Sequence, residues 1–177
     1  EMCIRDSVDA DPQANASSGL GVNSTTLSET IYECLIGGLP LDKVVRPTHV
    51  DNLFILPSHI DLVGAEIEML QLKDRETVMR EMLRPVVDQY DYILIDCSPS
   101  LGIITVNALV ASHSVIIPVQ CEYFALEGIS KLLNTIRIIK SRLNPTLEIE
   151  GFLLTMYDSR LRLANQVYDE VKEHFGQ

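Results

Sequence analysis

The sequence predicts an α/β fold in which a doubly wound, mostly parallel sheet is flanked by helices. Three apolar runs without polar alternation predict strands covered on both faces, over 91–96, 115–119 and 149–155. Between these runs, apolar residues recur every three or four positions, which is typical of amphipathic helices. Strands that alternate with helices of this length pair in parallel through right-handed crossovers.

The first seven residues, EMCIRDS, do not fit this pattern. They lack the apolar centre of a signal peptide and the alternation of a strand. We expect residues 1–7 to be foreign to the fold, and residues 8–177 to form one partial domain that is truncated at its N-terminus. A chain of 177 residues is long enough for one domain with a substantial core.

The remaining elements follow from helical spacing and from the positions of glycine and proline. The segment 14–26 is small and polar, which indicates a loop or a short helix. Pro85 is expected to interrupt the helix in which it lies. The spacing predicts a short strand over 52–56 and helices over 27–35, 62–70, 75–88, 103–110, 126–143 and 167–175.

Composition excludes several classes of protein. The net charge of 14 − 25 = −11 would repel nucleic acid and anionic membranes at long range. No apolar stretch approaches the ~20 residues that a membrane-spanning helix needs. The four cysteines form no CxxC pair and have no histidine at metal-ligand spacing, so they predict reduced thiols in the cytoplasm rather than zinc ligands or disulfides.

Asp96 is the first candidate for a site residue. It ends the apolar run Tyr92 to Ile95 and is followed by the turn 98–102, SPSLG. Ligands of parallel sheets gather at the carboxyl ends of the strands, and Mg²⁺ prefers oxygen ligands. Asp96 is therefore a candidate metal ligand, and the alternative is an acid that caps the following helix.

Asp9 and Asp11 are the second candidates, because they lie two residues apart just before Pro12. In an extended segment both carboxylates would point to one side. Asp11 could orient an attacking water molecule, since an ordinary carboxylate with a pKa near ~4 is a weak base at neutral pH. Asp9 would then support the metal and the phosphate-binding region. The alternative is an Asx turn that caps a helix, the usual role of Asp before Pro.

Other kinds of site find little support. The sequence contains no GxxxxGK[ST] phosphate loop, and the glycine pairs at 19–21 and 37–38 lack the lysine of such a loop. The four histidines are scattered, and neither Ser98 nor Ser100 has an identifiable histidine partner. Hydrolase triads and histidine metal clusters are therefore disfavoured.

Taken together, the motifs closely resemble the ParA/Soj chromosome-partitioning ATPases, members of the deviant Walker A (ParA/MinD) class of P-loop NTPases within the SIMIBI group. The resemblance covers residues 8–177. It rests on VDADPQ at 8–13, SGLG at 18–21, YDYILIDCSPSLG at 90–102, NAL at 107–109, IPVQ at 117–120, EYFALEG at 122–128 and TMYDSR at 155–160.

The resemblance implies a switch that depends on ATP and Mg²⁺, forms a homodimer around two nucleotides, binds DNA without sequence preference and is stimulated by a ParB-like partner. It further implies a cytoplasmic, nucleoid-associated protein. By motif, Asp11 is similar to the catalytic acid of the first switch and Asp96 to the metal-binding Walker B acid. Pro99 to Gly102 would form the second switch and, with Asp9, contact the cofactor. Met156 lies where relatives place a wall of the adenine pocket.

The sequence also departs from the family pattern. The family's KGGxGKT loop is expected upstream of DADPQ, where EMCIRDS stands, and the basic C-terminal segment is expected after His174-Phe175-Gly176. We therefore expect a fragment that is inactive by itself and binds DNA poorly. Two alternatives stay open: a MinD-like ATPase that acts at membranes, and a non-catalytic α/β interaction module.

Overall fold

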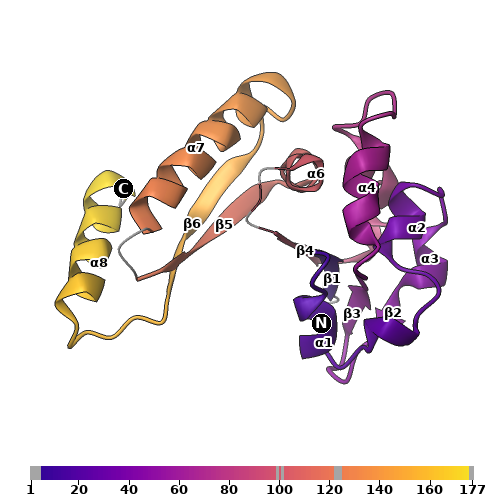
Figure 1. Ribbon diagram of the computed structural model, residues 1–177, viewed down its shortest axis with the longest axis horizontal. Coiled ribbons are helices and arrows are strands. Elements are labelled where there is room, and N and C mark those ends of the chain that lie inside the picture. Colours follow the sequence, from indigo (N-terminus) through magenta and orange to yellow (C-terminus); the bar gives the residue numbers. More distant parts are fainter. Residues whose placement is uncertain (1–4, 99, 101, 122–124, 176–177) are drawn as a thin grey trace. The chain divides into compact units, whose positions relative to one another are not determined.

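The computed structural model describes residues 5–98, 100, 102–121 and 125–175. Contacts within the chain divide it into two compact units, residues 1–112 and residues 113–177. Figure 1 shows the elements of both units. The assignment of residues 8–177 to one domain, preceded by seven foreign residues, stays a prediction.

The first unit contains a four-stranded sheet. Its strand order is β2-β3-β1-β4, with β1 parallel to both of its neighbours and β2 antiparallel to β3. The neighbouring strands β1 and β4 pair along their whole length, from Arg5 opposite Tyr92 to Ala10 opposite Cys97. The strands are β1 (Arg5–Ala10), β2 (Arg46–Pro47), β3 (Leu53–Leu56) and β4 (Tyr92–Cys97).

Six short helices accompany this sheet, and their buried residues form one apolar core with Val8, Ala10 and Leu56 of the strands. The start of α2 is fixed by a capping box, in which Thr30 and Glu33 satisfy each other's backbone amides. The helices are α1 (Asn15–Gly19), α2 (Ile31–Leu35), α3 (Leu41–Val44), α4 (Leu62–Met69), α5 (Val78–Leu83) and α6 (Ile103–Ala111), with 3₁₀ turns at Ser24–Thr26 and Val87–Gln89.

The second unit consists of a parallel strand pair and two longer helices. The strands are β5 (Ser114–Gln120) and β6 (Glu148–Thr155), and the helices are α7 (Ala125–Arg142) and α8 (Arg162–Phe175). Each helix buries one apolar stripe at helical spacing. The buried residues are Ile129, Ile136 and Ile139 of α7 and Ala164, Val167 and Val171 of α8.

The α/β class, the mostly parallel strands and the flanking helices confirm the predicted fold class. Pro85 follows the end of α5, so the predicted helix over 75–88 is shorter and ends before the proline. The strand β2 and the helix α3 were not predicted. In the described part of the chain, no helix is both long and apolar enough to cross a bilayer.

Two expectations about strands were wrong. Burial alternates along β4, with Tyr92 64% and Leu94 56% exposed, because Ile93, Ile95 and Cys97 pack on the core while the alternate residues face away. The prediction that this strand is covered on both faces is therefore wrong for β4 within this unit. The prediction that the first seven residues lack strand structure was wrong for Arg5 to Ser7, because β3 and β4 both pair with this segment.

Candidate functional site

The carboxyl ends of β1 and β4 bring the predicted acidic residues together. Asp9 and Asp96 occupy the same register position on adjacent parallel strands, and Asp11 follows the end of β1. Burial raises the pKa of Asp96 above its ordinary value, and the nearby charges of Asp9 and Asp11 raise it further. Three carboxylates from two sequence motifs thus converge at one edge of the sheet.

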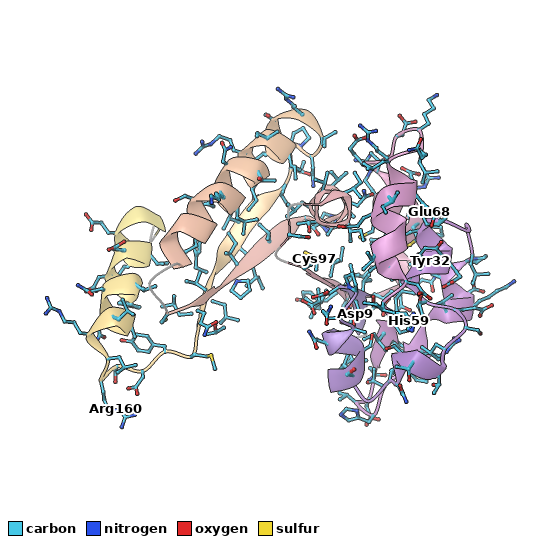
Figure 2. The ribbon with its side chains drawn as sticks, in the orientation of Figure 1. Asp9, Tyr32, His59, Glu68, Cys97 and Arg160 are labelled. Carbon is cyan, nitrogen blue, oxygen red and sulfur yellow. The ribbon has the colours of Figure 1, made fainter. Side chains whose placement is uncertain are left out.

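Asp9 is fully buried and is held by protein groups (Figure 2). Its Oδ2 accepts hydrogen bonds from the backbone N–H and the hydroxyl of Ser17, both at 2.7 Å, and its Oδ1 accepts one from the Asp11 N–H at 3.2 Å. The Ser17 hydroxyl in turn accepts a hydrogen bond from the Ser58 N–H at 3.1 Å. Asp9 therefore fixes α1 and the loop that carries Asp11, whereas its predicted support of a metal and of the phosphate-binding region stays a prediction.

Asp11 forms a local turn and also lines a cavity. Its Oδ1 accepts a hydrogen bond from the Gln13 N–H at 3.0 Å, and its carbonyl accepts one from the Ala14 N–H at 2.9 Å, while Ala14 has the left-handed φ of 53°. These contacts form the Asx turn that we considered as an alternative. Asp11 is also half-buried and lines a cavity.

This cavity has a volume of about 410 Å³ and is lined by residues of both predicted switch segments. Its charged lining residues are Asp11 and Glu66, and no basic side chain of the described residues lines it. The lining is formed by Ala10, Asp11, Pro12, Gln13, Val63, Glu66, Ser98, Ser100, Ile104 and Thr105. Sequence reasoning did not single out Glu66, because one acid on an amphipathic helix gives no distinguishing signal.

The turn between β4 and α6 is tied to the helix that follows it. The Thr105 hydroxyl contacts the carbonyls of Ser98 and Ser100, at 3.2 and 2.5 Å. Gly102 is the N-cap of α6 and has no side chain to cap the helix. Pro99, the other residue predicted for this switch, lies outside the described residues.

The donor chemistry of this edge fits a magnesium-bound phosphate. Mg²⁺ usually keeps several water molecules and binds through one or two carboxylates together with substrate phosphates, so it does not need a complete protein cage. The described residues contain no group of three or more His, Cys, Asp or Glu side chains that could hold a metal ion by themselves. Asp96, which is exposed at the end of β4 and is not among the residues that line the cavity, stays the predicted metal ligand.

The thiol beside this edge is not a nucleophile at neutral pH. Burial, with smaller contributions from the charges of Asp96 and Asp11, raises the pKa of Cys97 to about 11. Burial and the charges of Glu33 and Glu29 raise the pKa of Cys34 to about 12. Both thiols therefore remain protonated.

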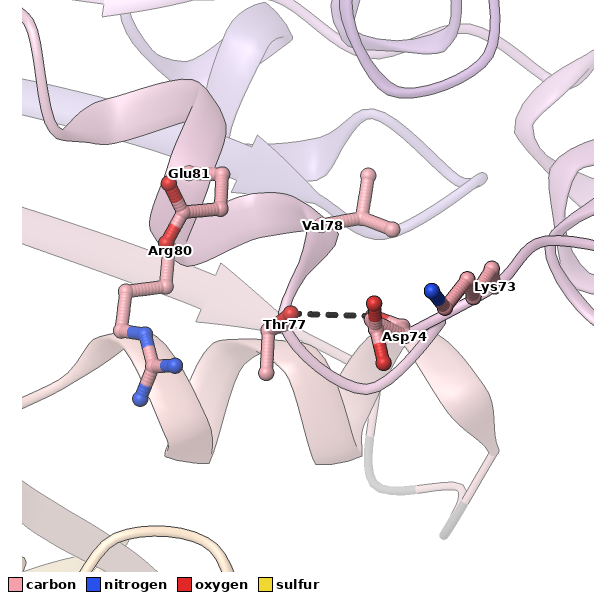
Figure 3. A pocket seen from close by; sticks show the side chains of 6 residues that line it. All are labelled: Lys73, Asp74, Thr77, Val78, Arg80 and Glu81. Atoms are coloured by element: carbon pink, nitrogen blue, oxygen red, sulfur yellow. Dashed lines mark hydrogen bonds between the residues drawn. The ribbon is translucent and has the colours of Figure 1, made fainter.

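A second hollow, of about 610 Å³, lies around the loop before α5 and contains none of the predicted site residues (Figure 3). The Thr77 hydroxyl donates a hydrogen bond of 2.9 Å to the Asp74 carbonyl at its centre. Its lining is formed by Lys73, Asp74, Thr77, Val78, Arg80 and Glu81.

Met156 belongs to the second unit, just after β6, where it has a φ of 52° and is 81% exposed. Its role in an adenine pocket stays a prediction. In the same unit the Arg160 guanidinium donates hydrogen bonds to Asp158 at 2.7 to 3.2 Å and holds the pKa of that carboxyl below its usual range (Figure 2). Arg160 is thus part of a local ion pair.

Comparison with known sequences gives close relatives. Residues 7–149 match the AAA_31 family, described as an AAA domain. The chain is 51% identical over 168 residues to the chromosome partitioning protein ParA of Myxococcus xanthus, and 50% identical over 168 residues to the sporulation initiation inhibitor protein Soj of Bacillus subtilis. Each match covers 95% of this chain, which spans 59% and 66% of the length of these two relatives.

Solved structures give the same result. The cobyrinic acid a,c-diamide synthase of Mycobacterium smegmatis with a bound ATP analog and magnesium has a TM-score of 0.92 at 35% identity, over 98% of this chain and 70% of that one. A plasmid partition protein from Borrelia burgdorferi has a TM-score of 0.81 at 27% identity, over 96% of this chain and 72% of that one. The chain therefore belongs to the AAA_31 family and is a ParA/Soj-like member of the P-loop ATPases.

Proposed function

We propose that this chain is the switch-bearing part of a chromosome- or plasmid-partitioning ATPase that uses ATP and Mg²⁺. The observation that carries the proposal is the cavity lined by Asp11 and by Ser98 and Ser100 of the turn after β4; the charge of Asp11 also raises the pKa of Asp96. The ParA and Soj relatives, and the ATP analog and magnesium bound to the synthase from Mycobacterium smegmatis, supply the chemistry that fits it.

In this proposal each acid has a separate task. Asp96 would hold the divalent cation, and Asp9 fixes the loop through Ser17. Asp11 orients the attacking water, because positioning matters more than deprotonation for a carboxylate of ordinary basicity. Gly102, at the amino end of α6, would belong to the switch that responds to the terminal phosphate. The cation would neutralise negative charge on the phosphates.

The partners of the whole protein are inferred from the same family. We propose a homodimer with ATP, binding of DNA without sequence preference, stimulation by a ParB-like protein, and a cytoplasmic location on the nucleoid. With a net charge of −11, this chain contributes little electrostatic attraction to DNA. The DNA contacts are therefore assigned to other parts of the whole protein.

The test uses the complete protein encoded by the reading frame that contains this chain. We expect slow ATP hydrolysis that a ParB-like partner and DNA accelerate together. Asp11→Ala should abolish turnover and leave Mg-ATP binding within about twofold, because Asp11 acts on the water and not on the nucleotide. Normal hydrolysis by this variant would remove Asp11 from its role.

A non-catalytic interaction module is the second candidate, since the Asx turn at Asp11 is a structural role by itself. Calorimetric titration with Mg-ATP separates the two cases. A module should bind no nucleotide, whereas the proposed ATPase should bind it with a saturable heat signal. The same titration with Asp96→Asn should show weaker binding only in the presence of Mg²⁺.

A further inference from the structure

Ser17 lies at the centre of a buried chain of hydrogen bonds that ends at the turn of Asp11. Ser17, Asp9 and Ser58 are each 0% exposed, so bulk water does not compete for their hydrogen bonds. The Ser17 N–H and hydroxyl both donate to Asp9 Oδ2 at 2.7 Å, and Asp9 Oδ1 accepts the Asp11 N–H at 3.2 Å. One buried carboxylate therefore joins α1 to the residue that lines the cavity.

The Ser17 hydroxyl also connects this chain of hydrogen bonds to the end of β3. It accepts a hydrogen bond of 3.1 Å from the Ser58 N–H, two positions after the last residue of that strand. The strands β1 and β3 are parallel neighbours, so the hydroxyl donates to a residue of one strand and accepts from the segment after the other. A hydroxyl that donates and accepts in this way has a fixed orientation, and it fixes Asp9 in turn.

The turn of Asp11 depends on such support. The Gln13 N–H donates to Asp11 Oδ1 at 3.0 Å and the Ala14 N–H to the Asp11 carbonyl at 2.9 Å, while Ala14 has the left-handed φ of 53°. This conformation is unfavourable for alanine and persists where surrounding contacts hold it. Ser17 and Asp9 hold the turn from both sides, because α1 starts directly after Ala14 and Asp9 binds the Asp11 N–H.

We propose that Ser17 is a positioning residue that acts through Asp9 to set the place of the Asp11 carboxylate. Ser17 does not line the cavity, so its effect on the reaction is indirect. The inference rests on the proposed function, in which Asp11 orients the attacking water. Loss of the hydroxyl would remove one donor to Asp9 and leave the buried Ser58 N–H without its acceptor, which loosens the turn.

The test compares Ser17→Ala with two control variants in the complete protein. Ser18→Ala makes the same change at the exposed neighbouring position of α1, and Val44→Ala destabilises the apolar core outside this chain of hydrogen bonds. Hydrogen exchange of the Gln13 and Ala14 amides reports on the turn without nucleotide. Steady-state hydrolysis gives kcat, and calorimetry with a non-hydrolysable Mg-ATP analogue gives Kd.

Ser17→Ala should exchange these two amides about tenfold faster and lower kcat about tenfold, because a displaced catalytic group slows the reaction. Its Kd should stay within about twofold of wild type, since Ser17 acts on Asp11 and not on the nucleotide. Ser18→Ala should match wild type in all three measurements. Val44→Ala should unfold more easily and keep kcat within about twofold.

Equal losses of kcat in Ser17→Ala and Val44→Ala would overturn the inference, because loss of stability would then explain both. Normal hydrolysis by Ser17→Ala, unchanged exchange of the two amides, or a Kd that rises as kcat falls would overturn it as well. If Ser17→Ala did not fold, Ser17→Cys would provide the same comparison, since its thiol is a weaker donor in the same place. If the wild-type protein hydrolysed no ATP, the proposed function would be wrong and the positioning role would fall with it.

Discussion

Asp6 gives a prediction about stability that is independent of nucleotide. It is 1% exposed on β1, beside Phe54 of β3 and Ile93 of β4 in the sheet register, and its Oδ1 has no hydrogen-bond partner. Burial raises the pKa of Asp6 to about 6 from 3.8, partly offset by a hydrogen bond with the Ser7 backbone. The carboxylate form is therefore disfavoured in the folded sheet.

The raised pKa of Asp6 fixes the sign of the pH dependence. The folded protein holds the Asp6 proton more tightly than the unfolded chain, so the contribution of Asp6 to stability is full below pH 3.8 and is lost as the pH rises to about 6. A shift from 3.8 to about 6 corresponds to about 3 kcal/mol, an upper value for the loss at neutral pH. Above that pH the loss is constant.

Asp6→Asn tests this reasoning, because it keeps the shape of the side chain and cannot ionise. Its free energy of unfolding, measured by urea titration at intervals from pH 4 to pH 8, should exceed that of wild type increasingly between pH 4 and 6 and by a constant amount above. Asp6→Leu should stabilise at neutral pH by about 2 to 3 kcal/mol, since it also removes a buried polar group. A difference between Asp6→Asn and wild type that does not change with pH would refute the argument.

Two further predictions concern buried hydrogen bonds. Ser17→Ala should lower the free energy of unfolding by about 2 kcal/mol, because it removes a donor to Asp9 and the acceptor of the Ser58 N–H, whereas the exposed neighbour Ser18→Ala should change it by less than about 0.5 kcal/mol. Asn107→Ala should lower the free energy of unfolding by about 3 kcal/mol in the same urea titration, because the fully buried Asn107 side chain accepts a hydrogen bond from the Met79 N–H and donates to two carbonyls. For either variant, a loss below about 1 kcal/mol would contradict its estimate.

The sequence was most informative where the local pattern is strong. The apolar run before Asp96 and the helical spacing around Ile136 predicted β4 and α7, because burial of one face determines these elements. The strand β2 contains only Arg46 and Pro47 and depends on pairing with β3, so no local pattern could predict it. Burial along β4 depends on which elements cover each face, which the residues of the strand do not specify.

The candidate site was predicted in a similar way. Asp96 was recognised because it ends an apolar run, and Asp9 and Asp11 because they lie two residues apart just before Pro12; the sheet register then brings Asp9 opposite Asp96. The hydrogen bonds that hold Asp9 could not be predicted, since they come from Ser17, eight positions away, whose hydroxyl also binds the Ser58 N–H. Glu66 was missed for the same reason: its place in the lining of the cavity exists only in the folded chain.

The Asx turn at Asp11 is compatible with the catalytic hypothesis as well as with a structural role. Its Oδ1 is occupied by the Gln13 N–H, and among the described residues its other oxygen has no hydrogen-bond partner. A carboxylate held by one oxygen is preorganised, and its free oxygen can position a water molecule without losing rotamer freedom in each turnover. Asp11→Asn tests this argument, because the asparagine oxygen can still accept the hydrogen bond of the turn while the charge is lost.

The two substitutions at Asp11 should therefore differ in stability and agree in activity. Asp11→Asn should unfold within about 0.5 kcal/mol of wild type, and Asp11→Ala should lose about 1 kcal/mol with the turn. Both should lose ATP turnover in the complete protein and keep Mg-ATP binding. If Asp11→Asn hydrolysed ATP at the wild-type rate while Asp11→Ala did not, the turn and not the charge would be what the reaction requires, and Asp11 would be a positioning residue of its loop.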